Sequence, residues 1–282
     1  MTKLTYVLTD IHGRLDLLEM ALKQIEKRGG YKRLVFLGDY VDRGPDSRHV
    51  VERLMQLEAN GNVVCLAGNH ELMFINYLTS QTELVDMFLE SGGRQALGSY
   101  ADEFGYLDIE AMSNHAAWMK NLPLWYRDEQ RIYVHAGIRP GEAVETQHPS
   151  VLTWSRMSDF FGASRASMGA YVVHGHTPVH DGKDLGEIEV TSARTNLDTG
   201  AHKTGKLAIG VFDDSQEKPI EVFSVFGPRP LAPHVREERA NRASASARAD
   251  ANRHIPRPPQ QAGGKIHALA ARFANAVSRG RL

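Results

Sequence analysis

The first third of the chain alternates between short apolar runs and segments with helical spacing. Three runs read as buried strands: "LTYVLTD" from residue 4, "RLVFLGD" from residue 33 and "NVVCLAG" from residue 62. A helical pattern follows each run, as in Leu15, Leu18, Leu22 and Ile25 after the first. Strand, loop and helix in three successive copies predict an α/β fold with an at least partly parallel sheet.

The remainder of the chain divides into a helical middle, a strand-rich part and a tail. Residues 82–121 have helical spacing, and then five strand candidates follow: "RIYVHAG", "AYVVHGH", "RTNLDTG", "KLAIGVFD" and "IEVFSVF". The apolar pattern ends at Phe226, after which the chain has little to bury. We therefore predict a folded domain over 1–227, a disordered basic linker over 228–264, and a short amphipathic helix over 265–282.

Charge separates the tail from the rest. The 282 residues have a net charge of −1, but the tail from Pro228 carries 11 basic and 3 acidic residues, a net charge of +8. Residues 1–227 therefore carry −9. The basic tail favours weak contact with an anionic membrane surface or an acidic partner, and no nucleic-acid partner is expected.

Composition indicates a soluble cytoplasmic protein. No apolar run approaches the roughly 20 residues of a membrane helix, and the first residues lack the pattern of a signal peptide. Cys65 is the single cysteine and stands between apolar neighbours, so we expect a small core residue rather than a nucleophile.

Polar residues follow each of the early strands. The first strand is followed by Asp10 and His12, the second by Asp39, and the third by Asn69. Ligands of α/β proteins collect beyond the carboxyl ends of strands, so these side chains are expected at one edge. Two later strands add imidazoles there: His135 from one, and His174 or His176 from the other.

These groups suit an intermediate divalent ion such as manganese, iron or zinc. Six ligands are too many for one catalytic ion with an open position, but they match two ions that share a carboxylate. A pair of ions about 3.5–4 Å apart can activate a nucleophile and stabilise both ends of a displacement at phosphorus. Asp39, on the middle of the three strands, is the natural bridge.

A set of motifs then identifies a family. "DIHG", "GDYVDRGPDS", "GNHE", "VHAG", "LTWSR", "HGHTP" and "LDTGAHKTGKLAIGVF" occur in this order. They resemble the phosphoprotein phosphatase family of calcineurin-like metallophosphoesterases, in particular its bacterial and phage-type members. The resemblance covers roughly residues 3–213 and implies a β-sandwich flanked by helices.

The resemblance also implies a role for each motif residue. One metal ion is held by Asp10, His12 and Asp39, and the second by Asp39, Asn69, His135 and His176. His70 is the general acid that protonates the leaving oxygen, oriented by Asp42, which is expected to raise its pKa. Arg43 and Arg156 bind the phosphoryl oxygens.

The implied activity is hydrolysis of phosphoserine and phosphothreonine, and by extension phosphotyrosine. A hydroxide on a dinuclear site, with manganese the first choice of metal, attacks phosphorus directly. The substrate is a phosphoprotein or a small phosphoester. A symmetrical dinucleoside tetraphosphate hydrolase is the alternative, against which Asp42 and Glu71 argue. A third hypothesis is a scaffold with a vestigial site.

Three points of the sequence depart from the pattern or leave it open. Thr9 stands where the family has a glycine, without removing a ligand. His176 is preferred over His174 as the ligand from "HGHTP". The histidines to which the resemblance assigns no role are expected to be structural or on the surface: His49, His115, His148, His180, His202, His234, His254 and His267.

Overall fold

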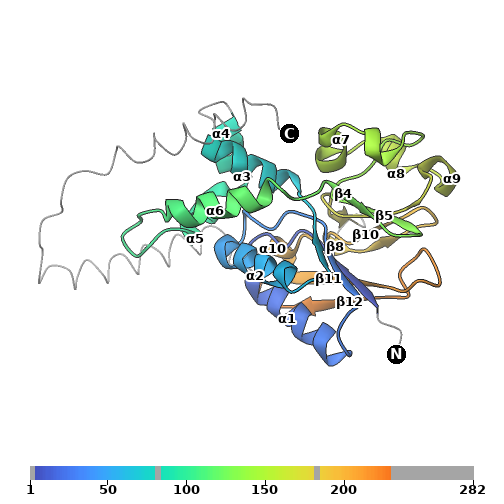
Figure 1. Cartoon of the computed structure of the whole chain (residues 1–282), viewed down its shortest axis with the longest axis horizontal. Helices are drawn as coiled ribbons and strands as arrows, with labels where there is room; N and C mark the ends of the chain where they lie inside the picture. Colours follow the sequence, from blue (N-terminus) through green and yellow to red (C-terminus); the bar gives the residue numbers. More distant parts are fainter. Residues whose placement is uncertain (1–3, 80–83, 181–184, 230–282) are drawn as a thin grey trace, which may run out of the picture. The chain divides into compact units, whose positions relative to one another are not determined.

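A computed structural model describes residues 4–79, 84–180 and 185–229 (Figure 1). Its described elements lie in one compact unit, Met1–Pro228. The strands are β1 (Thr5–Leu8), β2 (Arg33–Phe36), β3 (Val63–Cys65), β4 (Trp125–Arg127), β5 (Arg131–Val134), β6 (Tyr171–His174), β7 (Val179–His180), β8 (Leu185–Glu187), β9 (Glu189–Val190), β10 (Arg194–Asn196), β11 (Lys206–Phe212) and β12 (Glu221–Phe226). The α-helices are α1 (Leu15–Lys27), α2 (Ser47–Ala59), α3 (Asn69–Thr79), α4 (Leu84–Phe88), α5 (Arg94–Ser99), α6 (Ile109–Met119), α7 (Pro149–Trp154), α8 (Ser158–Phe161), α9 (Arg165–Met168) and α10 (Ala201–Thr204). A π-helical turn, η1 (Leu89–Gly93), and a 3-10 turn, η2 (Val144–Thr146), complete the described helices.

Two five-stranded sheets make up the centre of the fold. The first has the order β12-β11-β1-β2-β3, in which β1, β2 and β3 are parallel and the other neighbours pair antiparallel. The second has the order β4-β5-β6-β10-β9, with β5, β6 and β10 parallel. The three early strands therefore end at one edge of their sheet, as the repeated strand–helix pattern predicts.

The sheets pack face to face because side chains alternate along each strand. In β1, Val7 points into the cluster between the sheets, while Tyr6 and Leu8 point to the outer face. In β5, Tyr133 points inward, while Ile132 and Val134 point outward. The inter-sheet cluster consists of Val7, Val35, Leu37, Leu66, Tyr133, Tyr171, Val173, Leu197 and Phe212.

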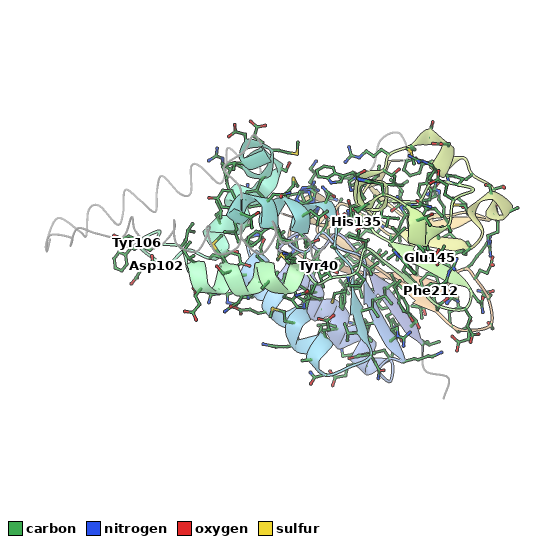
Figure 2. The ribbon with its side chains drawn as sticks, turned by 45° about the horizontal axis from the view of Figure 1, so that its top comes forward. Tyr40, Asp102, Tyr106, His135, Glu145 and Phe212 are labelled. Atoms are coloured by element: carbon green, nitrogen blue, oxygen red, sulfur yellow. The ribbon has the colours of Figure 1, made fainter. Side chains whose placement is uncertain are left out.

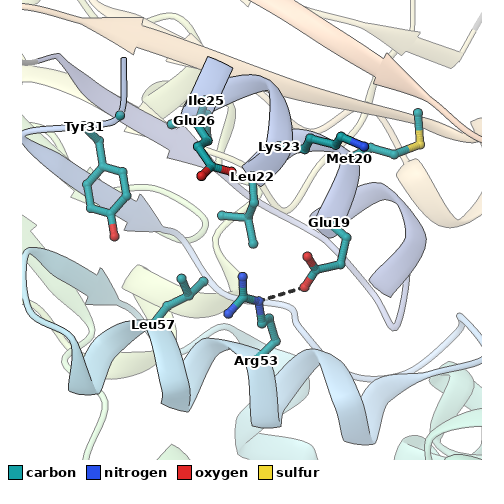
Figure 3. Close-up of a pocket in the computed structure, with 10 residues that line it drawn as sticks. Glu19, Met20, Leu22, Lys23, Ile25, Glu26, Tyr31, Arg53 and Leu57 are labelled. Atoms are coloured by element: carbon teal, nitrogen blue, oxygen red, sulfur yellow. Dashed lines mark hydrogen bonds and ion pairs between the residues drawn. The ribbon is translucent and has the colours of Figure 1, made fainter. Parts of the chain in front are cut away.

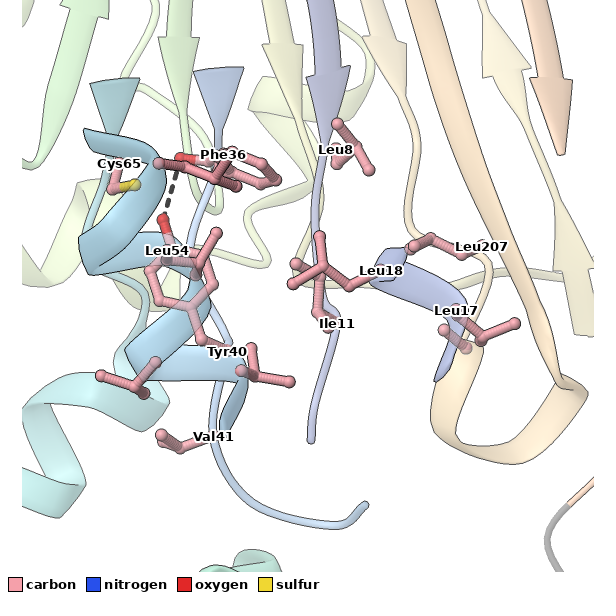
Figure 4. Close-up of a cluster of buried hydrophobic side chains, with 14 of the residues drawn as sticks. Leu8, Ile11, Leu17, Leu18, Phe36, Tyr40, Val41, Leu54, Cys65 and Leu207 are labelled. Atoms are coloured by element: carbon pink, nitrogen blue, oxygen red, sulfur yellow. Dashed lines mark hydrogen bonds between the residues drawn. The ribbon is translucent and has the colours of Figure 1, made fainter. Parts of the chain in front are cut away.

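Helices cover the outer faces of both sheets (Figure 1). Leu17 and Leu18 of α1 and Leu54 of α2 form one buried cluster with Leu8, Phe36 and Leu207 of the first sheet (Figure 4). Leu152 of α7 and Phe160 of α8 pack against the outer residues of β5 and β6. Each helix buries one apolar stripe, which is how an amphipathic segment stabilises a sheet.

The α/β prediction and the helix-flanked sandwich are confirmed. Cys65 is fully buried, as its apolar neighbours predict. Apart from Pro228 and Arg229, the predicted linker lies outside the described residues, and so does the predicted terminal helix. Among the described helices, we find none with the length and apolar character that crossing a bilayer requires.

Candidate metal centre

Unusual backbone conformations are concentrated at the predicted site residues. Seven non-glycine residues of the described chain have a positive φ, and six of them are predicted site residues: Asp10, His12, Asp39, Asp42, Arg43 and His176. A positive φ is costly for residues with a Cβ, and such strain concentrates at functional sites. The loops that follow β1, β2 and β6 are therefore shaped to present these side chains.

One group of ligand atoms converges on His135, which follows β5. Its Nδ1 lies 2.9 Å from the carbonyl of Leu37, so Nδ1 carries the proton and the Nε2 lone pair faces the site. That Nε2 lies 3.0 Å from Asn69 Oδ1, 3.1 Å from His176 Nδ1 and 3.4 Å from Asp39 Oδ1. Two ligands at right angles on one ion, with bonds of about 2.1 Å, lie about 3.0 Å apart. The group therefore has the spacing of a coordination shell.

A second group forms around His12, which follows β1. Its Nδ1 lies 2.8 Å from the carbonyl of Val41, which again leaves the Nε2 lone pair facing the site. Nε2 is 3.5 Å from Asp39 Oδ2. His12, Asp39 and His70 form one cluster that could hold an ion, and Asp39, His135 and His176 form another. Asp39 is common to both clusters.

Asp10 is buried beside these clusters and belongs to neither of them. Its Oδ2 accepts from the Thr9 hydroxyl at 2.5 Å and from the backbone N–H of His176 at 3.0 Å. The residue that departs from the family pattern, Thr9, thus binds the first carboxylate. A side chain at Gly175 would collide with that same oxygen, so Gly175 is required there.

His70 and Asp42 form a short pair, with 2.6 Å between Nδ1 and Oδ2. Burial, followed by the charge of Arg43, lowers the pKa of His70 well below its ordinary value. Asp42 is not among the largest causes of this shift, and the expectation that it raises the pKa of His70 stays a prediction. Burial raises the pKa of Asp42 itself, and its Oδ1 is buried without a hydrogen-bond partner.

Arg43 lies across the site and contacts two imidazoles. Its Nη1 donates to His12 Nε2 at 2.9 Å, and its Nη2 donates to His70 Nε2 at 2.8 Å. The arginine is held from behind, because its backbone N–H donates to the carbonyl of Gly92 at 3.1 Å. A side chain at Gly92 would clash with Arg43, which explains a glycine in the π-helical turn η1. None of the motifs in the sequence analysis includes this glycine.

Glu71 holds the loop that carries Asp39. Its buried carboxylate accepts from the backbone N–H groups of Asp39, Tyr40 and Gly68, each at 2.8 Å. These bonds join the end of β2 to the end of β3. In the sequence analysis, Glu71 served only to distinguish two branches of the family. In the structure, its carboxylate holds the backbone of the loop that carries Asp39. Its position directly after the predicted ligands is the signal that could have suggested this role.

The two histidines of "HGHTP" have different environments. His176 Nδ1 faces His135, and its Nε2 accepts from Arg156 Nε at 3.3 Å. His174 is fully buried and turned away, with its Nε2 3.1 Å from Arg194 Nη1. The structure thus brings His176, and not His174, to the candidate metal centre.

His202 also lies at this centre, although the sequence reasoning placed it among surface or structural histidines. Its ring is 5.1 Å from that of His12, and its buried Nδ1 has no hydrogen-bond partner. Burial lowers the pKa of His202 to about 3. His202 is the second residue of α10, which begins directly after Gly200 in the αL conformation. The tight turn at the end of "LDTG" is the sequence signal that could have suggested a position near the site.

The buried carboxylates of the site favour the binding of cations. Asp10, Asp39, Asp42, Glu71 and Asp198 are all buried. Burial, then the charge of Asp10, raises the pKa of Asp39 and of Asp198 well above the ordinary value. Buried carboxylates are stable when cations compensate them, and Arg43 supplies one charge. Two divalent ions on converging imidazole, amide and carboxylate ligands fit both this charge and this chemistry.

A cavity of about 660 Å³ lies elsewhere, between α1 and α2 (Figure 3). Leu22, Ile25 and Leu57 form its apolar floor, and Arg53 Nε donates to Glu19 Oε1 at 2.7 Å on its rim. None of the predicted site residues lines it. This cavity is therefore separate from the candidate metal centre.

The sandwich and its buried ligand edge define a metal-dependent phosphoester hydrolase. The family model of calcineurin-like phosphoesterases matches residues 4–201, and the chain belongs to that family. It is 29% identical over 238 residues to an asymmetrical bis(5'-nucleosyl)-tetraphosphatase, PrpE, of Bacillus cereus, which covers 71% of this chain and 87% of that protein. It is 32% identical over 139 residues to a symmetrical bis(5'-nucleosyl)-tetraphosphatase of Erwinia tasmaniensis, which covers 48% of this chain and 45% of that protein. A solved metallophosphoesterase of Sphaerobacter thermophilus has the same fold, with a TM-score of 0.52 and 18% identity over 97% of this chain and 99% of that one.

Proposed function

We propose that the protein is a dinuclear metal-dependent phosphomonoesterase that removes phosphate from serine, threonine and, by extension, tyrosine side chains. The observation that carries this proposal is the His70–Asp42 pair, 2.6 Å apart at the edge of the ligand clusters. The alkoxide released from a serine or threonine phosphoester is a poor leaving group and needs a proton. The phosphate released from a phosphoanhydride leaves more readily without one.

In the proposed assignment, Asp10, His12 and Asp39 hold one ion, and Asp39, Asn69, His135 and His176 hold the other. Manganese, iron and zinc all suit these ligands. The bound ions would supply charge compensation at the phosphoryl group and activation of the attacking water. The protein's own contribution is to fix the ligands through the carbonyls of Leu37 and Val41 and through Glu71.

Arg43 links phosphate binding to acid catalysis. Its guanidinium donates to the Nε2 atoms of His12 and His70. A phosphoryl group offers oxygens that match the planar fork of guanidinium better than an imidazole does. Among the charges near His70, that of Arg43 lowers its pKa most. When Arg43 turns to the phosphoryl oxygens, this positive charge moves away from His70 Nε2, and protonation of His70 becomes easier. His70 can then hold a proton at Nε2 for the leaving oxygen, with Asp42 bonded to Nδ1.

Arg156 completes the proposed phosphate site from the other side. It follows α7, and its Nε donates to His176 Nε2 at 3.3 Å. The side chain is exposed, so it can move to a bound phosphate without leaving a buried charge unpaired.

Hydrolysis of a dinucleoside tetraphosphate is the second candidate. The names of the relatives from Bacillus cereus and Erwinia tasmaniensis favour it. The family resemblance argues against the symmetrical reaction, because that branch carries alanine in place of Asp42. Both candidates use the same ligands and differ in how much the leaving group needs His70.

A substrate panel tests the proposal. The full chain, loaded in turn with manganese, iron and zinc, is assayed on p-nitrophenyl phosphate, a phosphoserine peptide and diadenosine tetraphosphate. We expect turnover of both monoesters. Efficient turnover of diadenosine tetraphosphate alone would assign the second candidate, and a complete lack of turnover would support the vestigial scaffold.

A further inference from the structure

One exposed aromatic side chain lies at the candidate metal centre outside the proposed ligand set. Trp154 is the last residue of α7 and is 41% exposed. Its ring centroid is 6.5 Å from that of His176, at an angle of 74°. Tyr106, which is 67% exposed, lies instead in the hairpin between α5 and α6, far from His135 (Figure 2).

The position of Trp154 is fixed by its neighbours in the helix. Val151, Leu152 and Thr153 are buried, so the next side chain is turned outward. The carbonyl of Leu152 accepts from the backbone N–H of Ala136 at 2.8 Å, directly beside the proposed ligand His135. The indole is therefore held next to the metal centre rather than on a free surface.

Trp154 shares its neighbour with a proposed phosphate-binding group. Arg156, two residues later, donates to the same His176 that the indole contacts. A single exposed aromatic residue is ordinary in a soluble protein. Here, however, Trp154 and Arg156 both contact the proposed ligand His176. Together they suit a ligand whose phosphate binds to the guanidinium and whose planar group lies on the indole.

The geometry distinguishes between two kinds of planar group. The ring of a phenyl ester is bonded to the bridging oxygen, and that oxygen must lie near the proposed acid, His70. Trp154 contacts His176, whereas His70 pairs with Asp42 and Arg43. A nucleobase is separated from its phosphate by a ribose and can therefore reach past the ligands. Bases stack on aromatic side chains because each base has a π face.

We propose that Trp154 is the stacking platform for the nucleobase of a nucleotide phosphoester substrate. This inference rests on the phosphoester hydrolysis that both candidate functions share. It adds nucleotide phosphoesters to the proposed substrates, as the second candidate requires, and it does not depend on serine or threonine specificity. Trp154 acts on affinity and not on the chemical step, because it contacts neither the acid nor the shared carboxylate.

Binding of the methylenephosphonate analogues of adenosine monophosphate and of ribose 5-phosphate, which differ by the base and have no hydrolysable phosphoester bond, tests the proposal. Calorimetric titration of the metal-loaded full chain should show about 5- to 150-fold tighter binding of the nucleotide. Trp154→Ala should bring this ratio close to one, while Trp154→Phe retains most of it. Tyr106→Ala, which removes a remote exposed ring, should leave the ratio unchanged.

Two results would overturn the proposal: a ratio near one in the unsubstituted protein, or a ratio that persists in Trp154→Ala. A rise in KM for a phosphotyrosine peptide in Trp154→Ala, without any nucleotide preference in the unsubstituted protein, would assign the platform to a phenol ring instead. The enzymatic proposal fails separately, through absence of turnover on every phosphoester. A nucleotide preference lost in Trp154→Ala would still support the platform in that case.

Discussion

At the scale of single residues, the shared carboxylate is the most informative position. Asp39 has one oxygen 3.5 Å from His12 Nε2 and the other 3.4 Å from His135 Nε2, so it faces both ligand groups. We expect Asp39→Asn to abolish activity and to weaken binding of both ions, because an amide cannot bridge them with a negative charge. Elemental analysis after gel filtration measures this. Two tightly retained ions would refute the bridging assignment.

The proposed acid gives a second prediction at this scale. His70→Asn should lower turnover of a phosphoserine peptide by about 10²–10⁴-fold, the usual contribution of general acid catalysis, with metal content near normal. The loss should be smaller for p-nitrophenyl phosphate, whose leaving group needs little protonation. Equal losses on the two substrates would exclude the acid role.

Sequence reasoning worked well for residues that directly follow a predicted strand and less well for those to which no motif assigns a role. Asp39, Asn69 and His135 each follow a strand, and strand ends meet at an edge, so their proximity could be foreseen. His202 and Gly92 reach the site through tertiary packing of α10 and η1. The sequence around these two residues does not show which segments they pack against, and the lowered pKa of His70 likewise depends on burial by distant segments.

At the scale of elements, Glu71 connects the first turn of α3 to the ends of β2 and β3. We expect Glu71→Gln to lower the free energy of unfolding by about 1–3 kcal/mol, because the amide places an N–H group against backbone donors. Metal affinity should fall as well, since Asp39 loses its support. Urea unfolding and metal titration measure the two effects.

Glu19→Gln is the matched control for this change. It removes a carboxylate of the same type from an exposed ion pair with Arg53 on α2. Its cost should stay within about 1 kcal/mol, with metal affinity unchanged. If the two variants behave alike, the three backbone bonds of Glu71 do not support the site.

At the scale of the whole molecule, the alternation of strands and helices was enough to predict the class of fold. It could not predict how the two sheets pack, because the inter-sheet cluster joins residues as distant as Val7 and Phe212. The boundary after residue 227 stays a prediction. Contacts at the end of the described chain refine where a truncation should be made.

The last described residues take part in the fold. The backbone N–H of Gly227 donates to the carbonyl of Gly205 at 2.8 Å, and Arg14 Nη2 donates to the carbonyl of Pro228 at 3.0 Å. Arg14 Nη1 also donates to the carbonyl of Ala201, beside His202.

A chain that ends at Phe226 should therefore lose about 1–3 kcal/mol of stability, because the hydrogen bonds of Gly227 and Pro228 are missing. A chain that ends at Arg229 keeps both bonds, and we expect it to melt like the full chain. Both truncations should retain their metals and their activity on p-nitrophenyl phosphate, since every proposed ligand precedes the cut. Loss of metals from the folded, longer truncation would place part of the tail in the catalytic domain.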